Sequence, residues 1–518
     1  MVEFGYLLIL LAQKILAVLL IPYFWWISKK PKKIIPKIDN PILFYSATKL
    51  SEKIRNRELT SEQIIKAYID RVKVVDIILK AVVQNRFDIA LAEAKNVDGY
   101  LKSCDLTENE LKVKYPLLGV PITVKESCSL QGMSYSVGSK LRRGVVAKSD
   151  GIAVKKLREA GAIPILVSNT PELCLFWESN NLIHERTCNP YDTNRTSAGS
   201  SGGEGSLLGS GASIIGVGSD VAGSIRLPAM FNGVFGHKPT SRIIPIDGHY
   251  PSSINDTLKD FLVIGPMTRY AEDLALMTKI MCDEKLTLNW NEIDTSKLNV
   301  YYEYQLEKAL FTPKTHKDIE RAIQKSVQSL KTYSNATIKH HKFDLSNTNE
   351  MCLSIIFDME NIPNVLMESM KPKKSRHLYL EILKSLLFCS DYSLQGLFFY
   401  ALQHTNVFIS KRKCDFYKNK ALMLKNDFLE KLGNNGVFLF PTYPTSAVLH
   451  NKLFVETSNV VYMLLFNVLG FPSTHVPIGR DSNNLPIGIQ VVAAPYRDNL
   501  CFSVAKELEK QFGGWSEP

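Results

Sequence analysis

The sequence predicts an α/β fold, in which helices and buried strands alternate along the chain. The continuous apolar run over residues 117–124 is typical of a fully buried strand, and it ends at Lys125. A helical pattern over residues 153–160 is closed by Gly161, and a second apolar strand over 163–167 follows at once. A helix followed directly by a short apolar strand indicates a sheet that is covered by helices.

The composition is that of a large globular protein. The chain has 518 residues, of which 45% are hydrophobic and 22% are charged, and this excludes disordered, collagen-like and disulfide-scaffold classes. Length alone permits two to four domains of about 100–200 residues each, or one unusually large one. The nine cysteines have no C-x-x-C spacing, so buried thiols are expected rather than a zinc site or a disulfide framework.

The N-terminal segment is predicted to bind a membrane. Residues 4–27 are almost wholly apolar, and about 24 residues at 1.5 Å each reach roughly 36 Å, enough for a tilted transmembrane helix. Trp25 and Trp26 stand at its end, as interfacial aromatic residues do. Because a signal peptidase needs small residues at that place, we expect an uncleaved anchor over residues 1–30.

A single span has one objection, which is the polar pair Gln13 and Lys14. A lysine in the middle of a transmembrane helix costs about 2.5–3.5 kcal/mol on insertion scales. The alternative is a hairpin or a helix that lies in the membrane interface. The lysines at 29–33 favour a cytosolic catalytic domain, and the expected location is an endomembrane or a lipid droplet.

The rest of the chain divides into a linker and one catalytic domain. Residues 31–50 are interrupted by prolines and solvated by lysines, so they are predicted to be a linker, with the catalytic domain over 51–518. Thr60 and Gln63 form a capping-box pattern that predicts the start of a helix. Further helices are expected over 87–101, 312–333, 378–388 and 394–402, and strands over 343–344, 437–440, 473–477 and 487–492.

A stretch rich in glycine and serine covers residues 197–224. Its composition is that of a flexible linker, but Leu207, Ile214 and Val217 lie inside it. We therefore interpret it as backbone that is packed too closely to leave room for side chains.

Serine chemistry in this stretch needs a base, since a serine hydroxyl is a weak nucleophile until its proton is removed. The ten histidines lie elsewhere in the sequence, whereas Lys125 directly follows a buried strand. Burial disfavours the ammonium form and lowers the pKa of a lysine, so that a neutral Lys125 amine can act as a general base.

Taken together, the motifs resemble the amidase signature family, over residues 45–510. The resemblance implies a large mixed β-sheet core surrounded by helices and preceded by the N-terminal membrane helix. The segments that carry the resemblance are 121–126, 189–190, 199–205, 218–226, 441–442, 467–472 and 488–490.

The family resemblance implies a Ser–Ser–Lys triad that needs no metal or cofactor. Ser224 would be the nucleophile, Lys125 the base, and Ser200, on a cis peptide with Gly199, would relay the proton between them. The developing oxyanion would be held by backbone N–H groups of Val221, Ala222, Gly223 and Ser224.

Three further positions are expected to support this site. Ser201 would hydrogen-bond within the loop, and Asp220 and Arg226 would fix the backbone around the nucleophile as partly buried charges. Ala198 and Ala222 stand where many family members have glycine, and alanine is comfortable only at negative φ. A departure in loop geometry is therefore expected near Ala222.

Within the family, the anchor and the segments 225–229 and 232–240 resemble membrane-anchored fatty acid amide hydrolases. The resemblance implies a lipid amide substrate, either a long-chain primary amide or an N-acylethanolamine, with the aromatic-rich helices at 378–402 lining its entry. Homodimers are expected by analogy alone.

Two alternatives to a fatty acid amide hydrolase remain open. One is a general amidase or a transamidase component that acts on a non-lipid amide such as charged transfer RNA, and the other is an inactive membrane scaffold. The net charge of +11 would suit nucleic acid, but part of it lies in the lysine cluster beside the anchor, so we assign it to an anionic membrane surface and expect no nucleic-acid partner.

Overall fold

One mixed β-sheet runs through the catalytic part of the chain. The computed structural model describes residues 4–252, 256–286, 288–306, 314–356, 366, 378–387, 389–404 and 411–518. The strands are β1 (Val82–Asn85), β2 (Pro121–Lys125), β3 (Ile163–Ser168), β4 (Ile215–Asp220), β5 (Phe235–Lys238), β6 (Val263–Thr268), β7 (Asn299–Tyr302), β8 (Thr337–Ile338), β9 (Gly436–Pro441), β10 (Ser473–Arg480) and β11 (Pro486–Ala493).

Within the described residues these eleven strands form a single sheet in the order β1-β3-β2-β4-β6-β5-β10-β11-β9-β7-β8. The strands β3, β2 and β4 run parallel, as do β9, β7 and β8, and the remaining neighbours pair antiparallel. The large mixed sheet is therefore confirmed. All five residues of β2 are buried, because the strand has a neighbour on each side and is covered on both faces.

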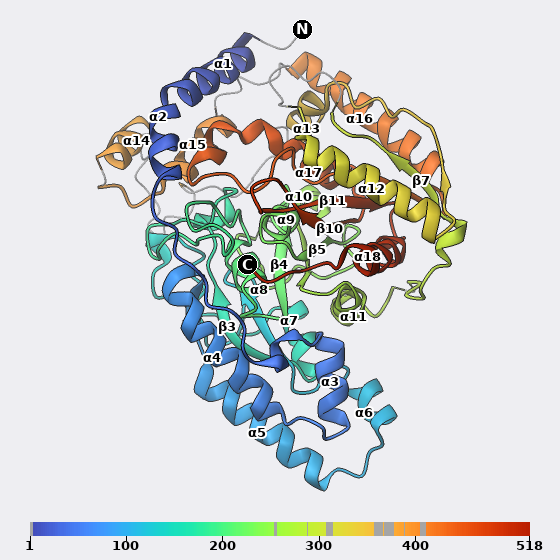
Figure 1. Cartoon of the computed structure of the whole chain (residues 1–518). Coiled ribbons are helices and arrows are strands. Elements are labelled where there is room, and N and C mark those ends of the chain that lie inside the picture. The colour runs from blue at the N-terminus through green and yellow to red at the C-terminus, as the bar shows by residue number, and fades with distance from the viewer. Residues whose placement is uncertain are drawn as a thin grey trace.

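Helices cover both faces of the sheet (Figure 1). The amphipathic α12 and the C-terminal α18 pack against β10 and β11, while α5 packs against β3 and α16 against β9. The helices are α1 (Phe4–Leu19), α2 (Ile21–Ser28), α3 (Ala47–Arg55), α4 (Ser61–Leu79), α5 (Phe87–Ser103), α6 (Glu108–Lys114), α7 (Ile152–Glu159), α8 (Gly202–Gly209), α9 (Arg226–Phe231), α10 (Asp256–Phe261), α11 (Glu272–Met281), α12 (Lys317–Tyr333), α13 (Thr348–Ile356), α14 (Leu378–Leu386), α15 (Leu394–His404), α16 (Lys411–Leu432), α17 (Val461–Val468) and α18 (Asp498–Phe512).

Most of the predicted elements are present, and two differ. The capping box at Thr60 and Gln63 opens α4 as expected, and the strands predicted in the last hundred residues are β9, β10 and β11. The strand predicted at 343–344 is absent, because Phe343 stacks against Phe428 of α16 instead of pairing at an edge.

Residues 31–50 include a short helical turn and buried side chains such as Leu43, so this segment packs against the domain along part of its length. Residues 312, 313 and 388 of the predicted helices lie outside the described residues.

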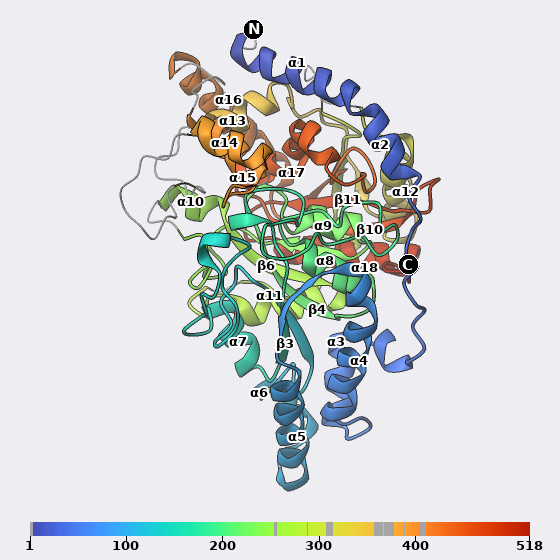
Figure 2. The same ribbon diagram turned by 90° about the vertical axis from the view of Figure 1, so that its left-hand side faces the viewer.

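The N-terminal segment folds as two helices, not as the continuous helix expected over residues 4–27. None of the described helices is by itself long and apolar enough to cross a membrane, although the pair Leu11–Leu19 and Ile21–Ser28 would qualify together and is bent by 49°. Pro22 explains the break, since proline lacks the N–H that would continue the helix. Figure 2 shows α1 and α2 running across the end of the molecule opposite α5.

Two hydrogen bonds hold α1 and α2 against the catalytic domain. Gln13 Nε2 donates to Thr457 Oγ1 at 2.8 Å, and Asn451 Nδ2 donates to the Tyr23 hydroxyl at 2.6 Å. Side chains on the opposite face of the two helices point to solvent, among them Ile15, Val18, Leu19, Trp25 and Trp26.

Candidate active site

The strand β2 delivers Lys125 into the interior of the protein. The side chain is 0% exposed, and it follows four buried strand residues that lie between β3 and β4. Its Nζ lies 2.6 Å from Ser200 Oγ and 2.9 Å from Ser219 Oγ. Two serine hydroxyls therefore contact the predicted base.

The glycine- and serine-rich stretch packs tightly into the core and is not a linker. The Gly199–Ser200 peptide is cis, as the family resemblance implies. A Cβ on Gly203 would lie 2.5 Å from the Asn169 backbone nitrogen, and one on Gly202 would lie 2.4 Å from Ser179 Oγ. The interpretation as closely packed backbone is confirmed, because no side chain fits at these positions.

The turn after β4 places Ser224 beside the loop that carries Ser200 and Ser201. Ser224 is 8% exposed and Ser200 1%, so the predicted nucleophile is the more accessible of the two. The Ser201 N–H donates to the Ser224 carbonyl at 3.1 Å, and Ser201 Oγ lies 3.4 Å from the Ser219 carbonyl oxygen. Ser201 thus bonds the loop to β4 and to the turn, whereas its bonds were expected to lie within the loop.

Asp220 and Arg226, which were expected to be partly buried charges around the turn, form an ion pair that is fully buried. Both side chains are 0% exposed, with Arg226 Nη2 3.1 Å from Asp220 Oδ1. Burial alone would raise the pKa of Asp220, but the Arg226 charge and hydrogen bonds from Arg226 and from the Gly223 and Ile225 amides hold it well below its usual range. The carboxylate is therefore ionised at neutral pH.

The Gly223 N–H differs from its predicted role. It donates to Asp220 Oδ1 at 2.7 Å, so in this structure it holds the turn and does not point to an oxyanion. Gly223 has a φ of +97°, and a Cβ there would lie 2.4 Å from Met463 Sδ. Of the four predicted amide donors, those of Val221, Ala222 and Ser224 remain for an oxyanion.

The departure expected near Ala222 is found at Ala198 instead. Ala198 has a φ of +64°, whereas Ala222 keeps a negative φ. The strained backbone is held by its neighbours, since the Ala198 N–H donates to Thr196 Oγ1 at 3.0 Å and its carbonyl accepts from Ser179.

Ser219 and His249 are site residues that the sequence did not identify. Ser219 lies inside the segment 218–226 that carries the family resemblance, but no role was predicted for it. His249 lies in a loop that is distant from this segment along the sequence. His249 Nε2 is 2.9 Å from Ser219 Oγ, so this histidine, which is distant from the site along the sequence, lies beside it in the fold. Its sequence neighbours give no hint of the contact.

Two further titratable groups surround Lys125. Burial raises the pKa of Glu204 to about 7, against hydrogen bonds from Ser168 and Thr123 and the charge of Lys125. At Cys174, burial would raise the pKa, but the charge of Lys125 and the neighbouring imidazole of His249 outweigh it and lower the pKa to about 6. The base therefore has an acid and a thiol as close neighbours.

A row of aromatic rings leads from the turn toward α1. Trp177 Nε1 donates to the Ala222 carbonyl at 2.9 Å. The ring of Phe176 lies 5.9 Å from that of Trp177 and 6.0 Å from that of Phe454, which in turn lies 4.7 Å from Phe398 of α15. The short helix η5 (Lys452–Val455) carries Phe454 and packs against α1.

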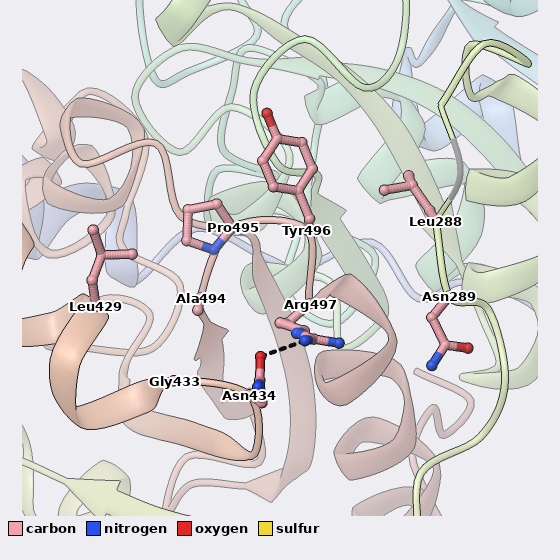
Figure 3. Close-up of a pocket in the computed structure, with 9 residues that line it drawn as sticks. All are labelled: Leu288, Asn289, Leu429, Gly433, Asn434, Ala494, Pro495, Tyr496 and Arg497. Atoms are coloured by element: carbon pink, nitrogen blue, oxygen red, sulfur yellow. Dashed lines mark hydrogen bonds between the residues drawn. The ribbon is translucent and has the colours of Figure 1, made fainter.

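A separate pocket of about 600 Å³ opens on the surface between the end of α16 and the start of α18 (Figure 3). Leu288, Leu429 and Tyr496 line it, and an Arg497–Asn434 hydrogen bond crosses its floor. None of the predicted site residues lines this pocket. Among the described residues, no three His, Cys, Asp or Glu side chains are grouped as metal ligands.

Comparison with known proteins places the chain among amidases. Residues 63–502 match the family described as Amidase. The fatty-acid amide hydrolase 2-A of Danio rerio is 37% identical over 500 residues, which cover 93% of this chain and 92% of that protein. The human fatty-acid amide hydrolase 2 is 36% identical over 499 residues, which cover 95% and 92%.

More distant relatives share the fold. A glutamyl-tRNA(Gln) amidotransferase subunit of Fusobacterium nucleatum is 26% identical over 516 residues, covering 93% of this chain and 99% of that protein. Among solved structures, a fatty acid amide hydrolase aligns with a TM-score of 0.72 at 24% identity, covering 91% of this chain and 86% of that one.

Proposed function

We propose that this chain, which belongs to the amidase signature family of amide-hydrolysing enzymes, acts on lipids. Its reaction would be the hydrolysis of long-chain fatty acid amides to a fatty acid and an amine. The observation that carries the mechanism is the 2.6 Å contact between Lys125 Nζ and Ser200 Oγ, beside the turn that carries Ser224. The lipid substrate is supported by the two fatty-acid amide hydrolases at 36% and 37% identity.

In the first step Lys125 acts as the base through Ser200. The neutral Lys125 amine accepts the Ser200 proton while Ser200 takes the proton of Ser224, and Ser224 Oγ attacks the amide carbonyl carbon. The carbonyl oxygen becomes an oxyanion, which the N–H groups of Val221, Ala222 and Ser224 stabilise.

In the second step the carbon–nitrogen bond breaks. The leaving nitrogen takes a proton from Ser200, which is replenished by the Lys125 ammonium, so the amine departs neutral and leaves an acyl ester on Ser224. Water then attacks this ester with the same groups acting as base, which releases the fatty acid and restores the Ser224 hydroxyl.

The acyl chain would lie along the aromatic row from Trp177 to Phe398. This row begins at the predicted oxyanion turn, passes through Phe454 of η5, which packs against α1, and ends at Phe398 of α15. An apolar wall in that direction suits a long hydrocarbon chain and has no use in the recognition of a small polar amide.

The two N-terminal helices would rest in the membrane interface. Their inner face bonds to the domain through Gln13 and Tyr23, whereas Trp25 and Trp26 are 63% and 54% exposed on the outer face. An apolar face of this kind, flanked by lysines at 29–33, suits a helix that lies on an anionic bilayer. Substrate would then enter from lipid close to the aromatic row.

A second candidate is the amidotransferase reaction. The match to the glutamyl-tRNA(Gln) amidotransferase protein covers 93% of this chain at 26% identity, and the triad would serve either reaction. The two differ in substrate: the first predicts hydrolysis of oleamide by the chain alone, and the second predicts hydrolysis of glutamine with transfer of ammonia to charged tRNA.

The decisive variant is Ser224→Ala. It is expected to fold normally, to lose oleamide hydrolysis by at least about 10³-fold, and to lose labelling by a fluorophosphonate probe. Ser103→Ala, at an exposed serine of α5, is the matched control and should behave as wild type. Labelling or hydrolysis that persists in folded Ser224→Ala protein would contradict the assignment of the nucleophile.

A further inference from the structure

Lys125 is the first member of a buried chain of hydrogen bonds that leads away from Ser200. Lys125 Nζ lies 2.9 Å from Ser219 Oγ, which lies 2.9 Å from His249 Nε2. The other ring nitrogen, His249 Nδ1, lies 3.1 Å from the Pro251 carbonyl oxygen. Ser219 is 3% exposed and His249 6%, so water does not compete for these bonds.

The last member of the chain sets the direction of every bond. A carbonyl oxygen can only accept, so His249 carries its hydrogen on Nδ1, and the Nε2 of the neutral ring is left as an acceptor. The Ser219 hydroxyl has one hydrogen, which it gives to Nε2. Ser219 must therefore accept a hydrogen bond from Lys125 and cannot donate one to it.

This direction matters because a neutral amine has two hydrogens and one lone pair. If Ser219 were free to turn, its hydroxyl could donate to the Lys125 lone pair and occupy it. With Ser219 fixed as an acceptor, one N–H of Lys125 is held on Ser219, and the lone pair is available to the Ser200 hydroxyl 2.6 Å away.

We propose that His249 is a positioning residue for the hydrolytic reaction: it holds Ser219 as an acceptor for Lys125 and so aims the Lys125 lone pair at Ser200. The inference rests on the proposed role of Lys125 as the base. His249 keeps its own proton throughout, since the proton that leaves Ser224 travels through Ser200 to Lys125 and back.

The backbone places His249 beside the strand that delivers Lys125. The Ser129 N–H donates to the Gly248 carbonyl and the Tyr250 N–H to the Ser127 carbonyl, both at 2.8 Å. The segment that follows β2 is thus paired with the segment around His249. Gly248 allows this close approach, since a Cβ there would lie 2.6 Å from Ser129 Oγ.

The test compares two substitutions at His249 in the full-length enzyme. His249→Phe removes the acceptor and is expected to lower kcat for oleamide by about one to two orders of magnitude. This loss is part of the roughly 10²–10⁴-fold acceleration that a positioned base supplies. The KM should change less than about twofold. His249→Gln places an amide oxygen near the Nε2 position and an amide nitrogen toward Pro251, and it should restore kcat to within about threefold of wild type. The rate of fluorophosphonate labelling at Ser224 should follow kcat in both variants.

A second variant covers the case in which His249→Phe does not fold. Ser219→Ala removes the acceptor directly and should cause a similar loss, and the double variant should be no worse than the worse single one, because both residues act through one contact. His341→Phe is the matched control: His341 bonds Asp427 at the far end of the sheet, and the change should leave kcat as it is.

Three results would overturn the proposal: wild-type kcat in folded His249→Phe protein, a His249→Gln variant as slow as His249→Phe, or losses from Ser219→Ala and His249→Phe that multiply. These outcomes are separable from failure of the proposed function. If the nucleophile is wrong, Ser224→Ala remains active; if only the lipid substrate is wrong, fluorophosphonate labelling of Ser224 still reports the effect of His249.

Discussion

The guanidinium of Arg226 and the carboxylate of Asp220 meet inside the protein on the two sides of the turn that carries Ser224. Arg226 Nε and Nη2 each lie 3.1 Å from an oxygen of Asp220, and the same carboxylate accepts from the Gly223 and Ile225 amides. Arg226 also donates to the Met463 carbonyl and to Gln490 Oε1, both at 3.0 Å, and to Asn467 Oδ1 at 2.5 Å. One ion pair thus ties the turn to β11 and α17.

Asp220→Asn is expected to destabilise the protein strongly. It leaves a buried guanidinium without its counter-charge, and breaking a buried pair in this way costs about 3–5 kcal/mol. Thermal unfolding and fluorophosphonate labelling should both show the loss. The control is Asp318→Asn, which breaks an ion pair with the exposed Arg321 and should change stability by less than about 1 kcal/mol; equal effects from both changes would contradict the role of the buried pair.

Stability should fall at alkaline pH because of His450. Burial alone would lower the pKa of His450, but hydrogen bonds with Cys188 and Glu178 and the charge of Glu178 outweigh it and raise the pKa to about 9. A raised histidine pKa contributes stability that is complete below the unfolded value of about 6.5 and is lost as the pH rises through about 9.

The measurement for His450 is the Tm between about pH 6.5 and 9.5. Wild type should lose stability across this window, whereas His450→Gln, which does not titrate, should start lower at pH 6.5 and lose less. A Tm that declines equally in the two proteins would show that another group is responsible.

Gly223→Ala should abolish activity. The added Cβ would meet Met463 Sδ at 2.4 Å, at a φ of +97° that alanine avoids. Gly132→Ala is a matched control, because Gly132 has a φ of +79° and nothing within 4 Å of the added Cβ. It should cost only the backbone strain, about 1–2 kcal/mol, and keep full kcat; a Gly223→Ala enzyme with normal kcat would exclude a tightly fixed turn.

Membrane binding should depend on the outer face of α1 and α2. Replacing Trp25 and Trp26 together by alanine is expected to weaken cosedimentation with anionic vesicles at least about tenfold, because burial of one large apolar side chain is worth about 1.5–3 kcal/mol. Ile77→Ala with Val113→Ala, which changes exposed apolar residues of α4 and α6 away from α1 (Figure 2), is the control and should bind normally. Unchanged binding of the tryptophan variant would place the membrane contact elsewhere.

Much of the architecture could be predicted from local pattern. The buried strand ending at Lys125, the capping box at Thr60 and the close packing of the glycine-rich loop all follow from spacing and side-chain size, and all are present. Pro22 could also have been used to predict the break between α1 and α2, but the apolar composition of residues 4–27 favoured one continuous helix.

The sequence by itself determined the α/β class, the close packing of the glycine- and serine-rich loop and the apolar N-terminal segment, because each depends on residues that are neighbours in the chain. Only the tertiary structure decided that His249 contacts Ser219, that the Gly223 amide is engaged by Asp220, and that positive φ falls on Ala198. The His249–Ser219 contact joins β4 to a loop 30 residues further along the chain. The other two features depend on how the turn after β4 and the loop before Ser200 are packed in the fold. Their geometry is set by the packing of the whole sheet, and no spacing along the chain records it.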